Sequence, residues 1–144
     1  MLLGAHEHTI DDKNRLTLPA KFRRAFADGI VVTRGLDECL HAYTPEAWSA
    51  VVERQLAPLN QFSREGRQMQ RFFYAGAVEA ELDKQGRVTI PPSLMQRAKL
   101  DRDVVVAGVN DHLEIWDRAA WQRELADVEG SAEDVAERLA AQGN

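Results

Sequence analysis

The chain is poor in cysteine, in long hydrophobic runs and in net positive charge, and each shortage argues against a class of protein. Its single cysteine, Cys39, can form neither an internal disulfide nor a zinc site built from several thiolates. This favours a reducing compartment, most simply the cytoplasm. The longest apolar run, residues 104–109, is far shorter than the roughly 20 residues of a membrane span. The N-terminal residues do not resemble a secretory signal, so we expect no membrane partner.

The charge is unevenly distributed along the 144 residues, whose net charge is −5. Residues 1–25 hold five Lys or Arg against three Asp or Glu, and residues 61–100 hold seven against four. Residues 101–144, in contrast, hold four against eleven. A net negative charge argues against nucleic acid. Two locally basic segments can nevertheless create a field opposite in sign to that of the whole chain.

An internal repeat organises the chain. Residues 4–19 align with residues 76–91 at an offset of 72, and one inserted residue then moves the offset to 73 as far as Trp48 and Trp121. About 16 of roughly 45 aligned positions are identical, far more than unrelated segments would share. Two copies are too few for a solenoid. Two β-rich halves with open strand edges are instead expected to close on one another.

Each copy shows the pattern strand, turn, strand, short helix and β-hairpin. The turns are Asp-x-x-x-Arg motifs at residues 11–15 and 83–87, with Asn14 or Gly86 at the position that tolerates a positive φ. A strand follows each turn, and a proline ends it.

Helices are predicted between and after the two copies. Thr44, Ser63 and Asp117 are suitable N-caps for three of them. Ser131 with Asp134 resembles a capping box and predicts a separate C-terminal helix.

The doubled turn is the strongest functional signal. Its Asp can accept the N–H groups of the turn or pair with the Arg, which would hold the guanidinium in one orientation. An arginine held in this way can bind phosphate, or guanine O6 and N7 together. A salt bridge confined to the turn, with no ligand, is the alternative interpretation.

These residues resemble a known family. The matching motifs stand at Gly4, 11–15 (DDKNR), 18–23 (LPAKFR), 31–35 (VVTRG), 39–40 (CL), 82–91 (LDKQGRVTIP), Gly108 and 114–117 (EIWD). From about residue 1 to residue 125 the chain resembles MraZ, a family of bacterial transcriptional regulators encoded with cell-division and cell-wall genes. The first copy departs from the pattern of the family because Asn14 stands where glycine is usual.

The resemblance implies an α+β, β-rich fold in which tandem SpoVT/AbrB-like repeats form a pseudo-symmetric swapped-hairpin β-barrel with flanking helices. We expect four segments along the chain: repeat 1 at 4–48, a helical connector at 49–75, repeat 2 at 76–121 and a C-terminal helical tail at 122–144.

The resemblance also implies a sequence-specific regulator that represses its own promoter and the division and cell-wall gene cluster. It would bind repeated promoter elements in double-stranded DNA as a ring-shaped homo-oligomer, in the cytoplasm and associated with the nucleoid. The expected DNA-binding residues are Arg15, Arg87, Lys13, Lys21, Arg23, Arg24 and Lys84. The expected turn-organising residues are Asp11, Asp83, Asn14 and Gly86. We expect no catalytic residue, metal, cofactor or small-molecule substrate.

Two other function classes stay open. An antitoxin-like protein would have another protein as its main partner, although such proteins usually carry one domain and a longer tail. An enzyme is less well supported, because no nucleophile with a base, phosphate loop or metal cluster is evident. Cys39 has no base placed beside it by sequence, and the neighbours Asp11 and Asp12 are poor candidates for a catalytic pair.

Several residues allow a structural or a functional interpretation. His6 and His8 share one face of a strand, which permits a metal site but fits a surface strand better. Aromatic residues are expected in the core or at a subunit interface rather than stacked on bases; they are Trp48, Trp121, Phe72 and Phe73. Three arginines at helical spacing favour a solvated face over DNA or a subunit contact; they are Arg64, Arg67 and Arg71.

Overall fold

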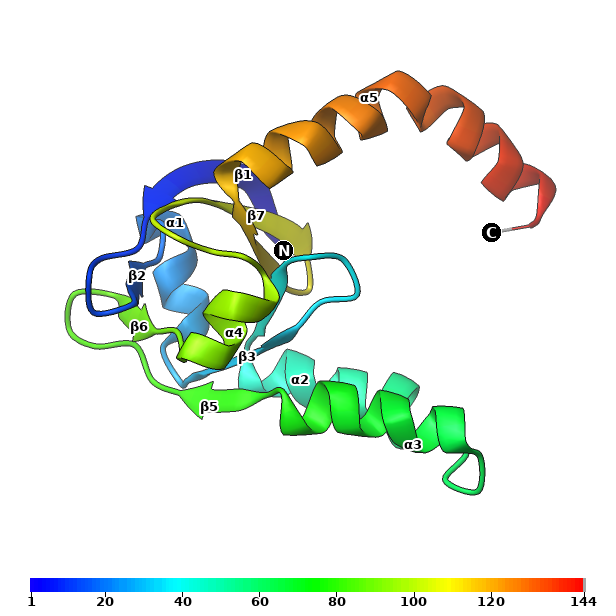
Figure 1. Cartoon of the computed structure of the whole chain (residues 1–144), viewed down its shortest axis with the longest axis horizontal. Coiled ribbons are helices and arrows are strands. Elements are labelled where there is room, and N and C mark those ends of the chain that lie inside the picture. The colour runs from blue at the N-terminus through cyan, green and yellow to red at the C-terminus, as the bar shows by residue number, and fades with distance from the viewer. Residues whose placement is uncertain (144) are drawn as a thin grey trace.

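The computed structural model of the protein describes residues 1–143, which form two antiparallel sheets and several helices (Figure 1). The expected α+β class is confirmed. The strands are β1 (Leu2–Thr9), β2 (Arg15–Thr17), β3 (Ile30–Arg34), β4 (Leu40–Tyr43), β5 (Val78–Ala80), β6 (Arg87–Thr89), β7 (Asp103–Asn110) and β8 (Leu113–Asp117). The helices are α1 (Ala20–Arg23), α2 (Pro45–Val51), α3 (Arg64–Gln70), α4 (Pro92–Arg97) and α5 (Arg118–Ala141). A 3₁₀ turn, η1 (Arg24–Phe26), continues α1, and the π-helical turns η2 (Val52–Leu56) and η3 (Arg71–Ala75) continue α2 and α3.

The strand order follows the internal repeat. The larger sheet has the order β1-β7-β8-β4-β3-β5, and β2 and β6 form a separate ribbon. Since β1 to β4 correspond to β5 to β8, this order is unchanged when the two repeats are exchanged. The first strand of each repeat pairs with the third strand of the other, and β4 meets β8 at the centre. The two halves therefore share one sheet, whereas a closed barrel with swapped hairpins stays a prediction.

One hydrophobic core joins the large sheet to the ribbon. The inner face of the ribbon contributes Leu16 and Val88, which lie opposite each other in register. They belong to the same buried cluster as Phe22 on α1 and Phe26 on η1, the two short helical elements that follow β2. Burying side chains of this size is worth about 1.5–3 kcal/mol each relative to exposure, so this cluster holds the ribbon firmly against the sheet.

Side-chain caps start three helices where the sequence predicted them. Each capping oxygen accepts the backbone N–H three residues ahead: Thr44 Oγ1 from Ala47 at 3.1 Å, Ser63 Oγ from Gly66 at 2.9 Å and Asp117 Oδ2 from Ala120 at 3.1 Å. These three predictions are confirmed. Such a cap satisfies one of the free N–H groups in the first turn of a helix and is typically worth about 1 kcal/mol.

The separate C-terminal helix predicted at Ser131 is wrong. Helix α5 runs without a break from Arg118 to Ala141, and the Ser131 hydroxyl donates to the Asp127 carbonyl at 2.8 Å instead of capping a new helix. Extending a helix adds one hydrogen bond per residue, whereas a second helix needs a costly new nucleus. Figure 1 shows α5 leading away from the sheets.

The four expected segments relate to these elements in different ways. The boundary at 75/76 coincides with the end of η3, whereas the boundaries at 48/49 and 121/122 fall within α2 and α5. The division into four segments stays a prediction. None of the helices in the part of the chain that the structure describes is long and apolar enough to cross a membrane.

Candidate nucleic-acid interface

The first Asp-x-x-x-Arg turn is organised by one carboxylate. Asp11 Oδ1 accepts the backbone N–H groups of Lys13 and Arg15, both at 2.9 Å, and Oδ2 accepts Arg15 Nε at 2.7 Å. Backbone hydrogen bonds from Asp11 to the Arg15 carbonyl and from Asn14 to the Asp11 carbonyl close the turn, both at 3.0 Å. Asn14 has a φ of 59°, in the left-handed region that asparagine tolerates better than most residues.

The second turn repeats this geometry. Asp83 Oδ1 accepts the N–H groups of Gln85 and Arg87 at 2.9 Å, and Oδ2 accepts Arg87 Nε at 2.7 Å. Gly86 has a φ of 77°. In both turns the Nε atom is held by the carboxylate, and within residues 1–143 neither arginine donates a hydrogen bond from its terminal Nη atoms. Each guanidinium therefore has a fixed direction and a free outer edge.

The two turns support each other across the repeats. Leu18 N–H donates to the Gly86 carbonyl at 3.0 Å, and Ile90 N–H donates to the Asn14 carbonyl at 2.7 Å. These bonds extend the β2–β6 ladder at both ends, so each turn is tied to the strand of the other repeat. Figure 1 shows the two turn loops side by side at one end of the molecule.

The outer face of the ribbon carries both arginines. In register, Arg15 lies opposite Thr89 and Arg87 lies opposite Thr17, while the residue between them on each strand faces the core. Residues paired across antiparallel strands point to the same side, so all four side chains share the outer face. The arginines are diagonal neighbours, a relation that places Cα atoms roughly 7–8 Å apart.

The pKa of both turn carboxyls is lowered. The backbone N–H of Arg15 is the largest cause for Asp11, and the backbone N–H of Arg87 is the largest cause for Asp83, with the guanidinium bonds adding to each. Both aspartates therefore stay ionised well below neutral pH, and the orientation of the arginines does not change through the physiological range.

The five further basic residues expected at DNA are spread around this ribbon. Lys13 and Lys84 are exposed within the two turns, and Arg24 is exposed in η1. Lys21 is exposed on α1, where its ammonium lies 5.4 Å from the centre of the Phe22 ring. The second repeat offers fewer free cations near its helix.

Arg23 also has a structural role, which was not predicted from the sequence. Its Nε donates to the Leu18 carbonyl at 2.9 Å, and its side chain lies against the second turn. A Cβ atom added to Gly86 would be 2.5 Å from Arg23 Cδ and Nε. Glycine is therefore required there by the approach of Arg23 as well as by its positive φ. At the equivalent turn of the first repeat, Gln96 stands in place of Arg23 as the residue that could approach Asn14 from the other repeat.

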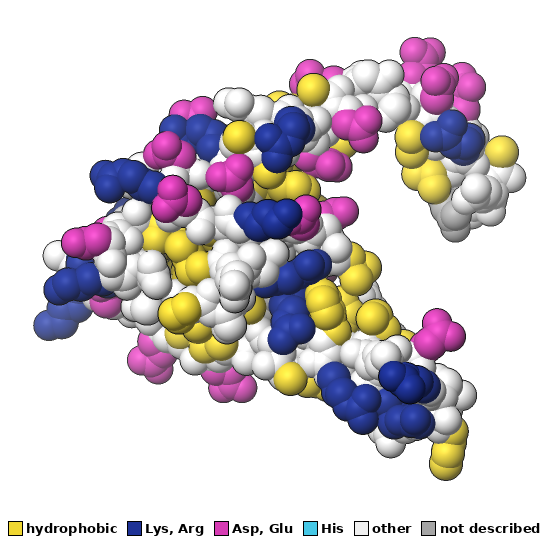
Figure 2. Space-filling model, viewed as in Figure 1, with side chains coloured by type: hydrophobic (Ala, Val, Ile, Leu, Met, Phe, Trp, Pro, Cys, Tyr) yellow, Lys and Arg dark blue, Asp and Glu magenta, His cyan; other side chains and the backbone are white. Residues whose placement is uncertain are grey.

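Other basic residues are engaged elsewhere. Arg97 donates to the carbonyls of Gly35 and Leu36, and Lys99 pairs with Glu38 at 3.0 Å, so both hold the β3–β4 turn. Figure 2 shows one group of Lys and Arg at the end where the ribbon loops lie and another group over α3. The second group is exposed and distant from the ribbon; it comprises Arg64, Arg67 and Arg71.

The expected packing aromatics do contact the body of the protein. The Trp48 ring lies 5.6 Å from that of Tyr43, and the Trp121 ring lies 5.7 Å from that of Trp116. Phe72 and Phe73 form an edge-to-face pair at 4.9 Å. None of the four lies on the ribbon, which agrees with a packing role.

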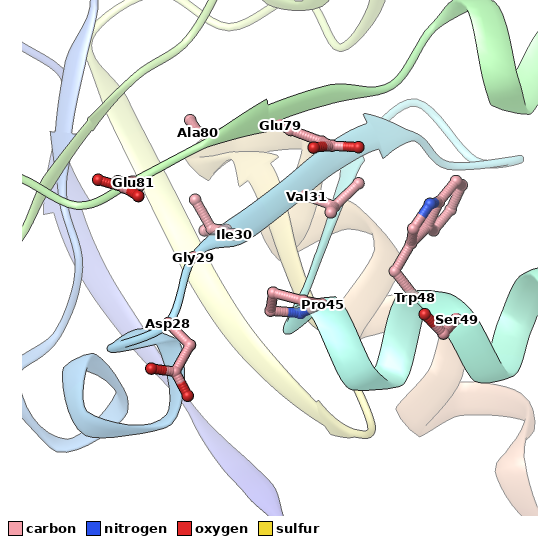
Figure 3. A pocket seen from close by; sticks show the side chains of 10 residues that line it. All are labelled: Asp28, Gly29, Ile30, Val31, Pro45, Trp48, Ser49, Glu79, Ala80 and Glu81. Carbon is pink, nitrogen blue, oxygen red and sulfur yellow. The ribbon is translucent and has the colours of Figure 1, made fainter.

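A pocket of about 420 Å³ between β3, β5 and α2 has an acidic lining (Figure 3). Asp28, Glu79 and Glu81 surround it, with Trp48 at one end. Carboxylates repel phosphate, so this hollow is a poor site for nucleic acid compared with the ribbon.

Comparison with known proteins places this duplicated architecture in a family. The family model described as "MraZ protein, putative antitoxin-like" matches residues 1–72 and, a second time, residues 73–142. The chain belongs to the MraZ family. The resemblance found in the sequence is therefore confirmed, and the two matched segments follow the internal repeat.

Curated relatives cover nearly the whole chain. The transcriptional regulator MraZ of Caldicellulosiruptor saccharolyticus is 44% identical over 139 residues, which is 96% of each chain. That of Thermoanaerobacter pseudethanolicus is 45% identical over 139 residues, again 96% of each. That of Roseiflexus castenholzii is 44% identical over 140 residues, or 97% of each. The names of these MraZ relatives support a role in transcription regulation.

Proposed function

We propose that this MraZ-family chain is a sequence-specific DNA-binding regulator that reads promoter DNA with the β2–β6 ribbon. The observation that carries the proposal is the pair of Asp-held arginines, Arg15 and Arg87, on the outer face of one two-stranded ribbon. The major groove of B-DNA is about 12 Å wide and admits such a ribbon, and it is where the four base pairs can be told apart.

Each arginine would bind with the edge that its aspartate leaves free. With Nε bonded to the carboxylate, Nη1 and Nη2 form a fork suited to guanine O6 and N7 or to a phosphate. The Thr17 and Thr89 hydroxyls lie beside them on the same face and can bond to base edges or phosphates.

Phosphate contacts would come from the surrounding cations. These are Lys13, Lys21, Arg23, Arg24 and Lys84. None of them lies on the core-facing side of the ribbon. Several copies on successive promoter elements would raise the avidity by about 10²–10⁴. We therefore infer a ring-shaped homo-oligomer that represses its own promoter and the division and cell-wall gene cluster, in the cytoplasm and at the nucleoid.

The acidic charge of the chain is compatible with this proposal. Helix α5 carries the acidic residues Glu124, Asp127, Glu129, Glu133, Asp134 and Glu137. Figure 1 shows α5 beginning beside β1 and β7 and running away from the two turn loops. DNA on the ribbon would therefore meet a locally basic surface and not the acidic helix.

The test is a fluorescence-anisotropy titration with the DNA upstream of the gene, against a scrambled duplex, at several salt concentrations. We expect Arg15→Ala and Arg87→Ala to abolish the preference for the promoter while the circular dichroism spectrum and the oligomer stay unchanged. One bidentate contact to guanine is worth about 1–3 kcal/mol, or roughly 5- to 150-fold, and each copy in the oligomer repeats the loss. Arg64→Ala, an exposed arginine on α3, is the matched control and should bind normally.

Salt dependence separates phosphate contacts from base contacts. The slope of log K against log salt should be steep, near −0.9 for each phosphate contact, and Lys84→Ala should reduce it without changing the preferred sequence. Wild-type affinity in Arg15→Ala, or no preference over scrambled DNA at low salt, would refute the proposal. The second result would favour a protein partner, which the antitoxin-like description of the family also suggests.

A further inference from the structure

Four polar side chains gather at the centre of the large sheet, away from the ribbon. His41 on β4 lies opposite Glu114 on β8, and Cys39 directly precedes β4. The ligand atoms of Cys39, His41 and Glu114 all lie within 4.8 Å of one another. His112 joins them from the β7–β8 turn, with its ring stacked on that of His41 at 4.3 Å.

We propose that Cys39, His41 and Glu114 form a site for a divalent transition-metal ion of borderline softness, Zn²⁺ above all. A thiolate, an imidazole and a carboxylate are all donors that this class of ion accepts. Ligands at about 2.1 Å from a tetrahedral Zn²⁺ are roughly 3.4 Å apart. The distance of 3.3 Å between His41 Nε2 and Glu114 Oε2 is close to this separation.

Neighbouring groups already orient the donor atoms. His41 Nδ1 lies 3.1 Å from the Tyr43 hydroxyl, which leaves Nε2 directed at the site. Glu114 Oε1 accepts Trp116 Nε1 at 3.0 Å, which leaves Oε2 directed at it. Metal-binding histidines and carboxylates typically have such outer partners, which fix the ring or carboxylate orientation.

His112 is the natural source of a fourth ligand. Its Nε2 lies 3.1 Å from Glu114 Oε2, and its Nδ1 lies 2.7 Å from Asp111 Oδ1. A carboxylate on the far nitrogen is the usual companion of a metal-bound imidazole. His112 Nε2 or a water molecule would complete the coordination.

The site borders a cavity. Glu114 and His41 line a cavity of about 230 Å³ that α2, η2 and Phe73 enclose. On the other side the backbone of Gly35 lies close to the donor atoms, since a Cβ there would lie 2.8 Å from Cys39 Sγ and 2.9 Å from His41 Nε2. Glycine at position 35 therefore keeps a side chain away from these two donors.

A nucleophilic role for the thiol is a poorer explanation of the same cluster. Cys39 is fully buried, and burial together with the charge of Glu114 raises the pKa of its thiol. Without an ion it is an unreactive thiol. A bound divalent cation would instead favour the thiolate form of Cys39, because it stabilises the negative charge on sulfur.

The test uses the full chain, reduced and freed of metal with a chelator, and titrates it with Co²⁺ as a spectroscopic probe. We expect one Co²⁺ per chain, a thiolate-to-cobalt charge-transfer band in the near ultraviolet, and displacement of Co²⁺ by Zn²⁺. Thermal unfolding should shift upward as the Zn²⁺ concentration rises.

Variants decide which residues hold the ion. Cys39→Ser should remove the charge-transfer band, and His41→Gln and Glu114→Gln should each weaken binding at least tenfold. His8→Gln, which alters a histidine on β1, is the control and should behave like the wild type. If Cys39→Ser does not fold, the other two variants test the same site. Absence of saturable Co²⁺ binding, or a band that persists in Cys39→Ser, would overturn the proposal.

Discussion

Gly86→Ala measures how much of the second turn depends on Arg23. The new methyl group would meet Arg23 Cδ and Nε at 2.5 Å, and the residue would have to keep a φ of 77°. The arginine side chain can move aside, but doing so breaks the 2.9 Å bond from its Nε to the Leu18 carbonyl. That bond joins the first helix to the end of β2, beside the second turn.

Backbone strain at position 86 and the lost Arg23–Leu18 hydrogen bond together should lower the stability measurably. A residue with a Cβ in the left-handed region costs roughly 1–2 kcal/mol. Losing a hydrogen bond from a charged donor costs about 1.5–3 kcal/mol, and the partial exposure of Arg23 puts it at the lower end. The free energy of unfolding should therefore fall by about 2–4 kcal/mol, which lowers the Tm by about 7–13 °C for a chain of this size.

Asn14→Ala is the matched control for Gly86→Ala. Asn14 also has a positive φ, 59°, but the residue equivalent to Arg23 in the other repeat is Gln96, so no arginine approaches Asn14 from that position. The free energy of unfolding of Asn14→Ala should fall by only about 1 kcal/mol, because only backbone strain is added. Both variants are compared by calorimetry and by urea unfolding. Equal losses in the two turns would refute the role assigned to Arg23.

Two further predictions concern α5 and the turns. Gly130→Ala, at an exposed position of α5 where nothing lies within 4 Å of the new Cβ, should favour that helix by about 0.8–1.0 kcal/mol. Amide exchange should slow along α5 while the Tm of the body is unchanged; a large Tm shift would mean that α5 is held by the core. The second concerns pH: the lowered pKa values of Asp11 and Asp83 mean that their stabilisation is complete above the ordinary aspartate range and is lost only as pH falls through the lowered values. Carboxyl NMR titrations should place both midpoints below the usual value of about 3.9, and midpoints at or above it would contradict the turn geometry.

The sequence predicted best what is decided by a few neighbouring residues. The two turns depend on an Asp and an Arg four positions apart and on one residue that tolerates a positive φ, so their geometry is local. The same holds for the caps at Thr44, Ser63 and Asp117. The repeat then predicted that the halves would close on one another, although it could not tell which strand pairs with which.

Contacts between distant residues were not predictable in the same way. The approach of Arg23 to Gly86 depends on how the first helix packs on the other repeat. Cys39 lies 75 positions before Glu114, so no spacing rule brings them together. At Ser131 the local capping pattern was present, but α5 has no buried residue whose packing would favour a break there. The helix therefore continues.

The tandem arrangement gives the central strand pair a chemistry that a symmetric dimer of one repeat could not have. His41 and Glu114 occupy equivalent positions of the two repeats and face each other in register. In a two-fold dimer of either repeat, each residue on the axis meets its own copy, which gives His beside His or Glu beside Glu. Two carboxylates in contact would repel each other. Joining the copies in one chain let the two positions differ, so an imidazole meets a carboxylate at the axis. The same freedom places Cys39 and His112, another equivalent pair, at the metal site that we propose, while Arg15 and Arg87 stay identical on the ribbon that we propose to face DNA.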